Sequence, residues 1–180
     1  MAAIFKKGDR HLASNYRPVS LTSVSCKVLE HIIFRSIMDH VDVHKILKFF
    51  QHGFRANHSC ETQLIDTIDD LARGLHNKQQ LDLLILDFSK AFDKVAHKRL
   101  ISKLQFYGIR NNTVLWLENW LIGRTQKVVV DGECSGGAAV KSGVPQGTVL
   151  GPLLFLLYIN DIFIFHQVIC GRLSFVQGDR

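Results

Sequence analysis

The chain has 180 residues, 47% of them hydrophobic, and its 22 Lys and Arg residues outnumber its 16 Asp and Glu residues. This length suits one ordinary domain or two small lobes that share a core. The positive balance, with a pI near 9.3, favours a polyanionic partner over an acidic protein or a neutral ligand. Many proteins that bind no nucleic acid have a similar balance, so composition alone leaves the partner open.

Cysteine spacing and hydrophobicity argue against several other classes. The four cysteines are widely separated and lack a CxxC spacing, which disfavours both a zinc site and a disulfide framework: Cys26, Cys60, Cys134 and Cys170. Free thiols are typical of an intracellular protein. The start, MAAIFKKGDR, lacks the apolar region of a signal peptide. The most apolar window, 149–165, is interrupted by polar and helix-breaking residues, so we expect no membrane span.

The first half of the chain predicts two amphipathic helices and one strand. Apolar residues recur at a helical period from Ser20 to Val41; they are Leu21, Val24, Val28, Leu29, Ile32, Ile33 and Ile37. After a loop with Gly53, a second helical period begins at Cys60, with Ser59 as its N-cap. The apolar run 81–88 then predicts a buried strand.

The second half predicts a mixed pattern, which indicates an α+β fold. Its expected elements are a helix over 96–107, a helix over 112–122, two short strands around the turn Asp131-Gly132, and a helix over 153–163. Gly108 and Gly123 mark the ends of the first two helices. Pro152 suits the first turn of the last one.

Four short stretches carry polar or glycine-rich motifs at the ends of these elements: NYRPVSLTS (15–23), QHGFRANHS (51–59), LDFSKAFD (86–93) and SGVPQGTVLGPLLF (142–155). Each alone has an ordinary explanation as a turn, a loop, a cap or the start of a helix. The third poses a physical question, because a carboxylate at the end of a buried strand is costly unless it is paired or binds a metal. Asp is also a favoured N-cap, so Asp87 by itself leaves both interpretations open.

Together and in this order, the motifs resemble the reverse transcriptase domain of non-LTR (LINE-like, jockey-type) retrotransposons. The resemblance runs from Lys6 to Ile162, and its most specific parts are YRPVSL, LDFSKAFDKV and SGVPQGTVLGPLLF. It implies a right-hand polymerase fold without the thumb. In that fold 1–80 would form the fingers region, 81–163 a partial palm with interleaved fingers elements, and 164–180 a tail outside the family.

The resemblance implies an RNA-directed DNA polymerase whose partners are an RNA template, a DNA primer and deoxynucleoside triphosphates. In such enzymes a primer 3′-hydroxyl attacks the α-phosphate, assisted by two Mg²⁺ ions. Asp87 matches the catalytic carboxylate that binds the metal, and the main-chain carbonyl of Phe88 would be a further ligand. Phe92 matches the aromatic that excludes a 2′-hydroxyl. Gln146 and Gly147 match the segment that contacts the nucleotide.

Basic residues and one further glycine complete the predicted site. Arg55 suits a phosphate, and other basic residues are also candidates for the triphosphate or the template backbone: Arg17, Lys6 and Lys48. For Arg17 and Lys48 a solvated surface position is an equal alternative. Gly143 and Gly147 would let the backbone approach a ligand closely. Asp93 also fits the family pattern, and we interpret it as a helix cap.

The sequence lacks one element that the family has after the position of Gln146, and it stops resembling the family after about Phe163. The family completes its metal site with a pair of aspartates in a later hairpin, whereas the acidic residues that follow here are Asp161 and Asp179. We therefore interpret the chain as a copy truncated before that hairpin and inactive alone. Two alternatives are a non-catalytic nucleic-acid-binding remnant and a pseudogene product. In every case we expect Asp87 and Gln146 to line one open cleft.

Overall fold

The computed structural model describes residues 1–162 except 84, 86 and 131. The chain divides into two compact units. The first comprises Met1–Ile46 and Lys90–Tyr158, and the second comprises Leu47–Ser89 and residues from Ile159 onward. These units are defined by contacts within the chain, so the functional division predicted at residues 80 and 163 stays a prediction.

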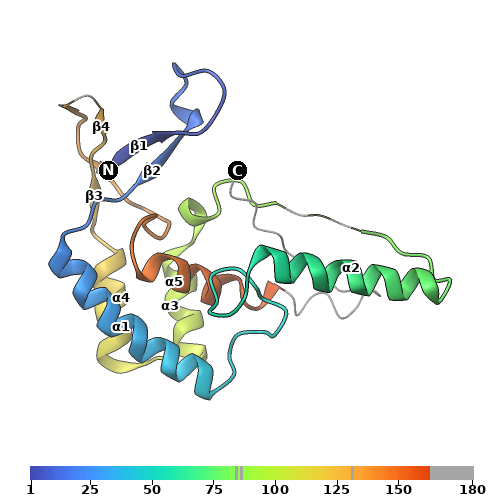
Figure 1. The fold of residues 1–180 in the computed structure, drawn as a ribbon. Coiled ribbons are helices and arrows are strands. Elements are labelled where there is room, and N and C mark those ends of the chain that lie inside the picture. The colour runs from blue at the N-terminus through green and yellow to red at the C-terminus, as the bar shows by residue number, and fades with distance from the viewer. Residues whose placement is uncertain (84, 86, 131, 163–180) are drawn as a thin grey trace. The chain divides into compact units, whose positions relative to one another are not determined.

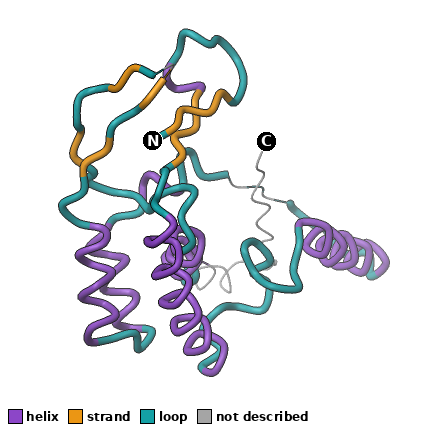
Figure 2. The backbone as a smooth tube through the Cα atoms, turned by 60° about the vertical axis from the view of Figure 1, so that its left-hand side comes forward, coloured by secondary structure: helices purple, strands orange, loops and turns teal. Residues whose placement is uncertain are grey.

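The strands of the first unit form two small sheets. β1 (Ala2–Phe5) pairs antiparallel with β2 (Tyr16–Val19) and parallel with β4 (Val129–Val130). β4 pairs in turn with β5 (Glu133–Cys134), which gives the order β2-β1-β4-β5. A separate antiparallel pair is formed by β3 (Thr125–Gln126) and β6 (Ala138–Ala139). Figures 1 and 2 show these strands gathered at one end of the unit and its helices at the other.

The β1–β2 hairpin shows that YRPV is a strand, so a turn, one ordinary explanation of the NYRPVSLTS motif, is wrong for these residues. Tyr16–Val19 is a strand, preceded by the short 3-10 helix η1 (Ala13–Asn15). Pro18 lies opposite Ala3 and has no N–H to donate to a sheet. The strand tolerates it because β2 is at the edge of its sheet, where only one side needs a partner.

The predicted first helix is confirmed as α1 (Val24–Val43). It begins after Ser23, whose hydroxyl accepts a hydrogen bond from the N–H of Cys26 at 3.2 Å. Its buried residues are Glu30, Ile37 and Val41, whereas several of the periodic apolar residues are exposed: Val24, Val28, Leu29 and Ile32. The helix is apolar on two opposite faces, so its period predicts the helix but not the face that is buried.

Three further helices of the first unit confirm predicted elements. They are α3 (His97–Phe106), α4 (Asn111–Leu121) and α5 (Leu150–Ile159). Gly108 and Gly123 follow α3 and α4 with φ of 86° and 73°, the left-handed conformation that ends a helix. α5 begins three residues earlier than predicted, and residue 163 lies outside the described part. Most of α5 is buried, so it forms the centre of the core: Leu150, Gly151, Leu153, Leu154, Phe155, Leu156 and Leu157.

The strand predicted over 81–88 is wrong for the described residues of that range. They lie in irregular chain, and Leu84 and Leu86 are outside the described part. The apolar side chains of Leu83 and Ile85 are 56% and 72% exposed. A strand needs a neighbour for its N–H and C=O groups, and none of the described strands pairs with this segment. Apolar composition alone therefore did not determine a strand.

The second unit contains α2 (Cys60–His76), which confirms the other predicted helix and its N-cap. The Ser59 hydroxyl accepts the N–H of Thr62 at 3.2 Å, and Thr62 Oγ1 accepts the N–H of Ser59 at 2.9 Å. This reciprocal pair satisfies two N–H groups at the start of the helix. A hydrogen bond with Ser59 also lowers the pKa of Glu61. Of the helices described in either unit, none is long and apolar enough to cross a membrane.

The cap predicts a measurable effect on stability. Ser59→Ala should lower the free energy of unfolding by about 1 kcal/mol, because the N–H of Thr62 loses its acceptor. Urea denaturation followed by far-ultraviolet circular dichroism measures this loss. Ser36→Ala makes the same chemical change at an exposed position inside α1 and should leave stability nearly unchanged. Equal effects of the two substitutions would contradict a capping role for Ser59.

Candidate functional site

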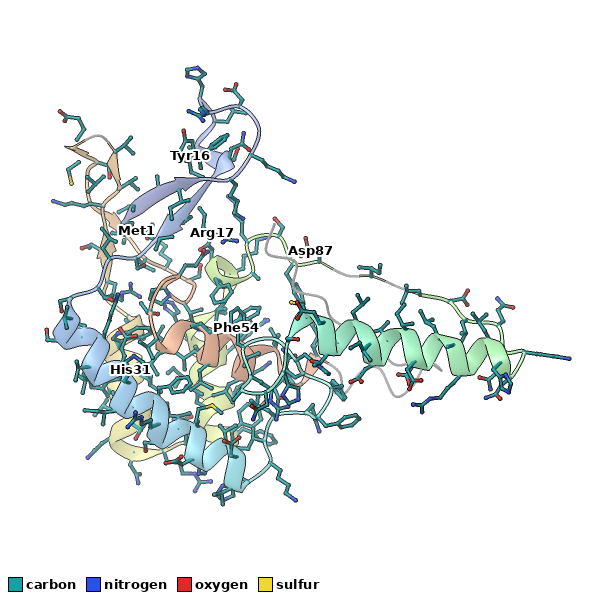
Figure 3. All side chains as sticks on the ribbon, viewed as in Figure 1. Met1, Tyr16, Arg17, His31, Phe54 and Asp87 are labelled. Carbon is teal, nitrogen blue, oxygen red and sulfur yellow. The ribbon has the colours of Figure 1, made fainter. Side chains whose placement is uncertain are left out.

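A pocket of about 550 Å³ lies in the first unit and is lined mainly by the β1–β2 hairpin. Five of its lining residues are basic: Lys6, Arg10, His11, Arg17 and Lys90. Of the described residues that line it, Asp93 carries a carboxylate, and Gln146 is also part of the wall. Figure 3 shows Tyr16 and Arg17 at neighbouring positions of β2. This excess of cationic side chains suits an anionic ligand.

The loop of the hairpin is held by aromatic and polar contacts. The Arg10 guanidinium lies 5.1 Å from the centre of the Phe5 ring, and that ring meets Tyr16 edge to face at 5.5 Å. The Tyr16 hydroxyl donates to the carbonyl of Arg10 at 2.9 Å. The N–H of Lys6 donates to the carbonyl of Asn15, also at 2.9 Å. These contacts fix the loop that carries the basic residues.

Gln146 lies on a loop that is hydrogen-bonded to Ser20 and to Asp93. Its main-chain carbonyl accepts the N–H of Ser20 at 2.8 Å. Its side-chain Nε2 donates to Asp93 Oδ1 at 3.4 Å. Asp93 lies within the 3-10 helix η2 (Phe92–Lys94), and the N-cap of α3 is Ala96. The interpretation of Asp93 as a helix cap is therefore wrong, because its carboxylate faces Gln146.

Backbone hydrogen bonds join the 142–147 loop to η2. The N–H groups of Gly143 and Val144 donate to the carbonyls of Val95 and Phe92, each at 2.8 Å. The buried imidazole of His97 contacts the Gly143 carbonyl through Nε2 at 2.8 Å. Gly143 has φ of 91°, and a Cβ there would lie 2.9 Å from the Cα of Asp93. Gly143 thus allows two backbones to approach, a role different from the predicted approach to a ligand.

Gly147 makes a second close contact in the same loop. Its φ is 87°, and a Cβ there would lie 2.8 Å from Val19 Cγ1 and 3.2 Å from the carbonyl oxygen of Ser20. The glycine therefore lets the loop lie against the end of β2. Its predicted contact with a nucleotide stays a prediction.

Phe92 packs beside this loop. Its half-buried ring stacks on Phe155 of α5, with centroids 4.7 Å apart and an angle of 21° between the planes. This contact holds η2 against the core. The role of Phe92 in excluding a 2′-hydroxyl stays a prediction.

Asp87 and Phe88 belong to the second unit, so their predicted proximity to Gln146 stays a prediction. Both residues are exposed, and Asp87 is labelled in Figure 3. Within the described part of the chain, no three His, Cys, Asp or Glu side chains are grouped so that they could hold a metal ion. Mg²⁺ takes about six oxygen ligands in near-octahedral geometry. One carboxylate and one carbonyl therefore do not by themselves fit a two-ion site.

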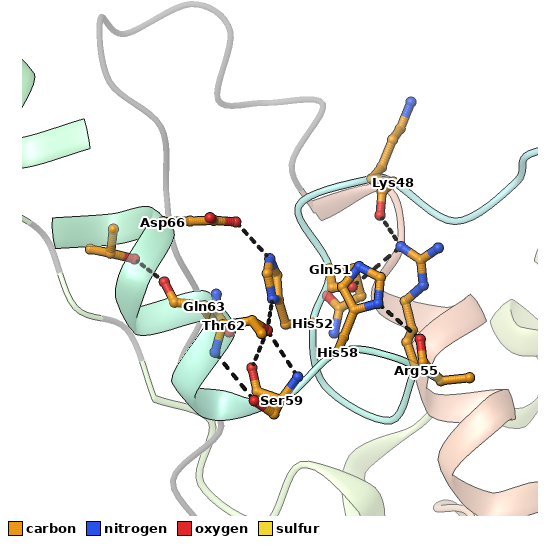
Figure 4. Close-up of polar contacts among 11 residues, drawn as sticks. Lys48, Gln51, His52, Arg55, His58, Ser59, Thr62, Gln63 and Asp66 are labelled. Carbon is orange, nitrogen blue, oxygen red and sulfur yellow. Dashed lines mark hydrogen bonds and ion pairs between the residues drawn. The ribbon is translucent and has the colours of Figure 1, made fainter. Parts of the chain in front are cut away.

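Arg55 lies in the second unit on a loop that is tied to α2 (Figure 4). Its Nη1 donates to the carbonyls of Lys48 at 2.8 Å and Gln51 at 3.3 Å. Nearby, the buried His52 contacts Thr62 Oγ1 at 2.8 Å through Nδ1 and Asp66 Oδ2 at 3.3 Å through Nε2. The guanidinium thus stabilises its own loop. Its contact with a phosphate, and that of Lys48, stay predictions.

A known family matches most of this sequence. The match covers residues 4–170, and the family is described as Reverse transcriptase (RNA-dependent DNA polymerase). The chain belongs to this reverse transcriptase family. The match ends at residue 170, whereas the sequence predicted that a tail outside the family begins at residue 164. The boundary of that tail stays a prediction.

Similar proteins are known from mobile elements of insects. The RNA-directed DNA polymerase from mobile element jockey of Drosophila melanogaster is 34% identical over 148 residues, which are 82% of this chain and 16% of the relative. The probable RNA-directed DNA polymerase from transposon X-element of the same species is 35% identical over 87% of this chain and 17% of the relative. A Pol polyprotein from a type-1 R2 element of Popillia japonica is 28% identical over 87% of this chain. The chain thus spans about a sixth of the length of the first two relatives.

Sequence reasoning missed three basic residues that line the pocket. Arg10, His11 and Lys90 line it, whereas Lys6 and Arg17 are the lining residues that the sequence had named as candidates for a phosphate. Arg10 and His11 were missed together with the hairpin that positions them. The available signal was the basic loop KKGDRH, which follows the short apolar run AAIF and precedes YRPV.

The close contact at Gly143 predicts a strong effect of a single methyl group. Gly143→Ala should lower the free energy of unfolding by about 3 kcal/mol, because it adds left-handed strain and a clash with the Phe92–Asp93 backbone. Gly136→Ala is a matched control, since a Cβ at Gly136 would meet nothing within 4 Å. Chemical denaturation of both variants measures the difference. A Gly143 variant as stable as the Gly136 variant would refute this packing.

Proposed function

We propose that this chain is the part of an RNA-directed DNA polymerase that binds the incoming deoxynucleoside triphosphate, with the phosphates in the basic pocket. The observation that carries the proposal is that Lys6, Arg17 and Gln146 line one pocket. The sequence predicted Gln146 as a nucleotide contact and named Lys6 and Arg17 as candidates for the triphosphate or the template backbone, with a solvated surface position as an equal alternative for Arg17. The pocket volume of about 550 Å³ falls within the range of about 300 to 1,000 Å³ of small-molecule sites. Guanidinium and ammonium groups are the side chains best suited to phosphate oxygens.

We infer that the whole polymerase copies an RNA template by extending a DNA primer. The names of the jockey and X-element relatives, RNA-directed DNA polymerases, support this inference. In that reaction Lys6 and Arg17 would neutralise the triphosphate, and Gln146 would orient the nucleotide. Phe92 would exclude a 2′-hydroxyl. Residues 1–80 would act as fingers and 81–163 as part of the palm.

The same proposal assigns the metal ligands. Asp87 and the main-chain carbonyl of Phe88 would hold Mg²⁺, which supplies stabilisation of the charge on the phosphate oxygens when bound. Further oxygen ligands would have to come from other segments, because Asp87 provides a single carboxylate. The resemblance places two of them on an aspartate pair that does not follow Gln146 in this sequence.

The pocket can be tested by binding without catalysis. Lys6→Ala and Arg17→Ala should each weaken binding of deoxyadenosine triphosphate by about tenfold or more, since each removes a charged contact with phosphate. Isothermal titration calorimetry at low salt measures the affinity. Lys141→Ala and Arg99→Ala remove exposed charges outside the pocket and should bind as the parent chain does. Deoxyadenosine bound as tightly as its triphosphate would contradict a phosphate site.

Catalysis requires a different test. In a polymerase that contains this segment together with the rest of the protein, Asp87→Asn should lower primer extension about a thousandfold or more, because a metal ligand contributes several kcal/mol. Asp82→Asn removes an exposed carboxylate from the same segment and should have little effect. The 180-residue chain alone should show no extension. Equal rates for the two variants would contradict the assignment of Asp87.

A further inference from the structure

Glu30 is a buried carboxylate that contacts the start of the helix following the Gln146 loop. It lies in the middle of α1 and is 1% exposed. Its Oε2 accepts the N–H of Val149 at 2.8 Å and that of Leu150 at 3.2 Å. Leu150 is the first residue of α5. The first N–H groups of a helix lack partners within the helix, and the helix dipole favours a negative charge there.

The segment 145–151, which connects this contact to the pocket, is a turn closed by hydrogen bonds of the Thr148 hydroxyl. These hydrogen bonds couple the two ends of the segment. Thr148 Oγ1 donates to the carbonyl of Pro145 at 2.8 Å and accepts the N–H of Gly151 at 3.1 Å. A Cβ at Gly151 would lie 2.5 Å from the same Pro145 carbonyl. Gln146 lies inside this turn, next to Pro145. A displacement at Val149 would therefore shift Gln146, which lines the pocket.

The charge of Glu30 acts on Arg124, although no hydrogen bond joins Glu30 Oε1 to Arg124 Nη1. Arg124 is close enough for the Glu30 charge to oppose the effect of burial, which lowers the pKa of Arg124. Glu30 Oε1 and Arg124 Nη1 are both buried, and neither has a hydrogen-bond partner among the described residues. The hydrogen bonds of this carboxylate thus go to the start of α5. A hydrogen bond to a charged acceptor contributes more than one to a neutral acceptor, so the charge of Glu30 strengthens both contacts.

We propose that Glu30 is a positioning residue for the polymerase site, which holds Gln146 in the pocket through the N-terminus of α5. The proposal rests on the proposed function in its last step, the contact of Gln146 with a nucleotide. Its first step, the fixing of residues 146–150, does not. Replacement by Gln keeps the size of the side chain but removes its charge and one of its two acceptor oxygens. The loop should then open more often while the surrounding helices stay folded.

Amide hydrogen exchange tests the first step. In Glu30→Gln, exchange at Val149 and Leu150 should become about tenfold faster, because each N–H loses a charged acceptor. Exchange at Leu104 and Leu117, in α3 and α4, should stay as in the parent chain. Glu133→Gln, a change at an exposed carboxylate, should leave all of these amides unchanged. Unchanged exchange at residues 149 and 150, or equal acceleration in every helix, would overturn the positioning role.

A double-mutant cycle tests the second step. Glu30→Gln and Gln146→Ala should each weaken binding of deoxyadenosine triphosphate, and the double variant should bind no more weakly than Gln146→Ala alone, because both changes act through one side chain. Additive losses would overturn the connection to Gln146. If the parent chain binds no triphosphate, the proposed function fails, while the exchange experiment still decides the role of Glu30.

A second variant covers the case in which Glu30→Gln does not fold. Thr148→Val removes both hydrogen bonds of the hydroxyl inside the turn and leaves Glu30 in place. It should abolish the dependence of triphosphate affinity on Gln146 while exchange at Val149 stays slow. A full effect of Gln146→Ala in the Thr148→Val background would show that the turn does not transmit the position of α5, and would overturn the proposal.

Discussion

The candidate site depends on the close approach of two backbones at Gly143. A side chain at this position would lie 2.9 Å from backbone atoms of Phe92 and Asp93, closer than real Cβ atoms come. The absence of that side chain lets two backbone hydrogen bonds form between the loop and η2. The same approach brings the Gln146 amide to the Asp93 carboxylate. The contact between Gln146 and Asp93, two lining residues of the pocket, therefore depends on this backbone geometry.

The β1–β2 hairpin, which lines most of the pocket, is connected directly to the loop that carries Gln146. The N–H of Ser20, just after β2, donates to the carbonyl of Gln146, so a backbone hydrogen bond joins the end of the hairpin to the loop. The electrostatic repulsion within the pocket is unfavourable, since among its described lining residues the four Lys and Arg side chains outnumber the carboxylate of Asp93. Like charges at this density repel one another, and an anionic ligand relieves that repulsion. A phosphate group bound in the pocket, as proposed, should consequently stabilise the β1–β2 hairpin.

Local patterns predicted the helices, whereas contacts between distant residues were not predictable. Ser59 and Gly108 were found because caps act within one turn of their helix. The β1–β2 hairpin was missed because strands of four residues are too short to show a period, and Pro18 suggested a turn. The strand predicted over 81–88 was wrong because apolar composition does not supply a neighbouring strand with which to pair. Glu30 was missed because a charged residue in a helix ordinarily lies at the surface.

The two parts of the proposed catalytic site make different physical demands on the chain. A triphosphate site needs cationic groups on a stable frame, and the first unit supplies both from its own residues. A two-metal site needs several oxygen donors, placed to within a fraction of an ångström and contributed by separate segments. Asp87 is one such donor and is exposed in the second unit. In the proposed function, nucleotide binding and phosphoryl transfer are thus separable properties, and binding is the one that depends on residues of the first unit.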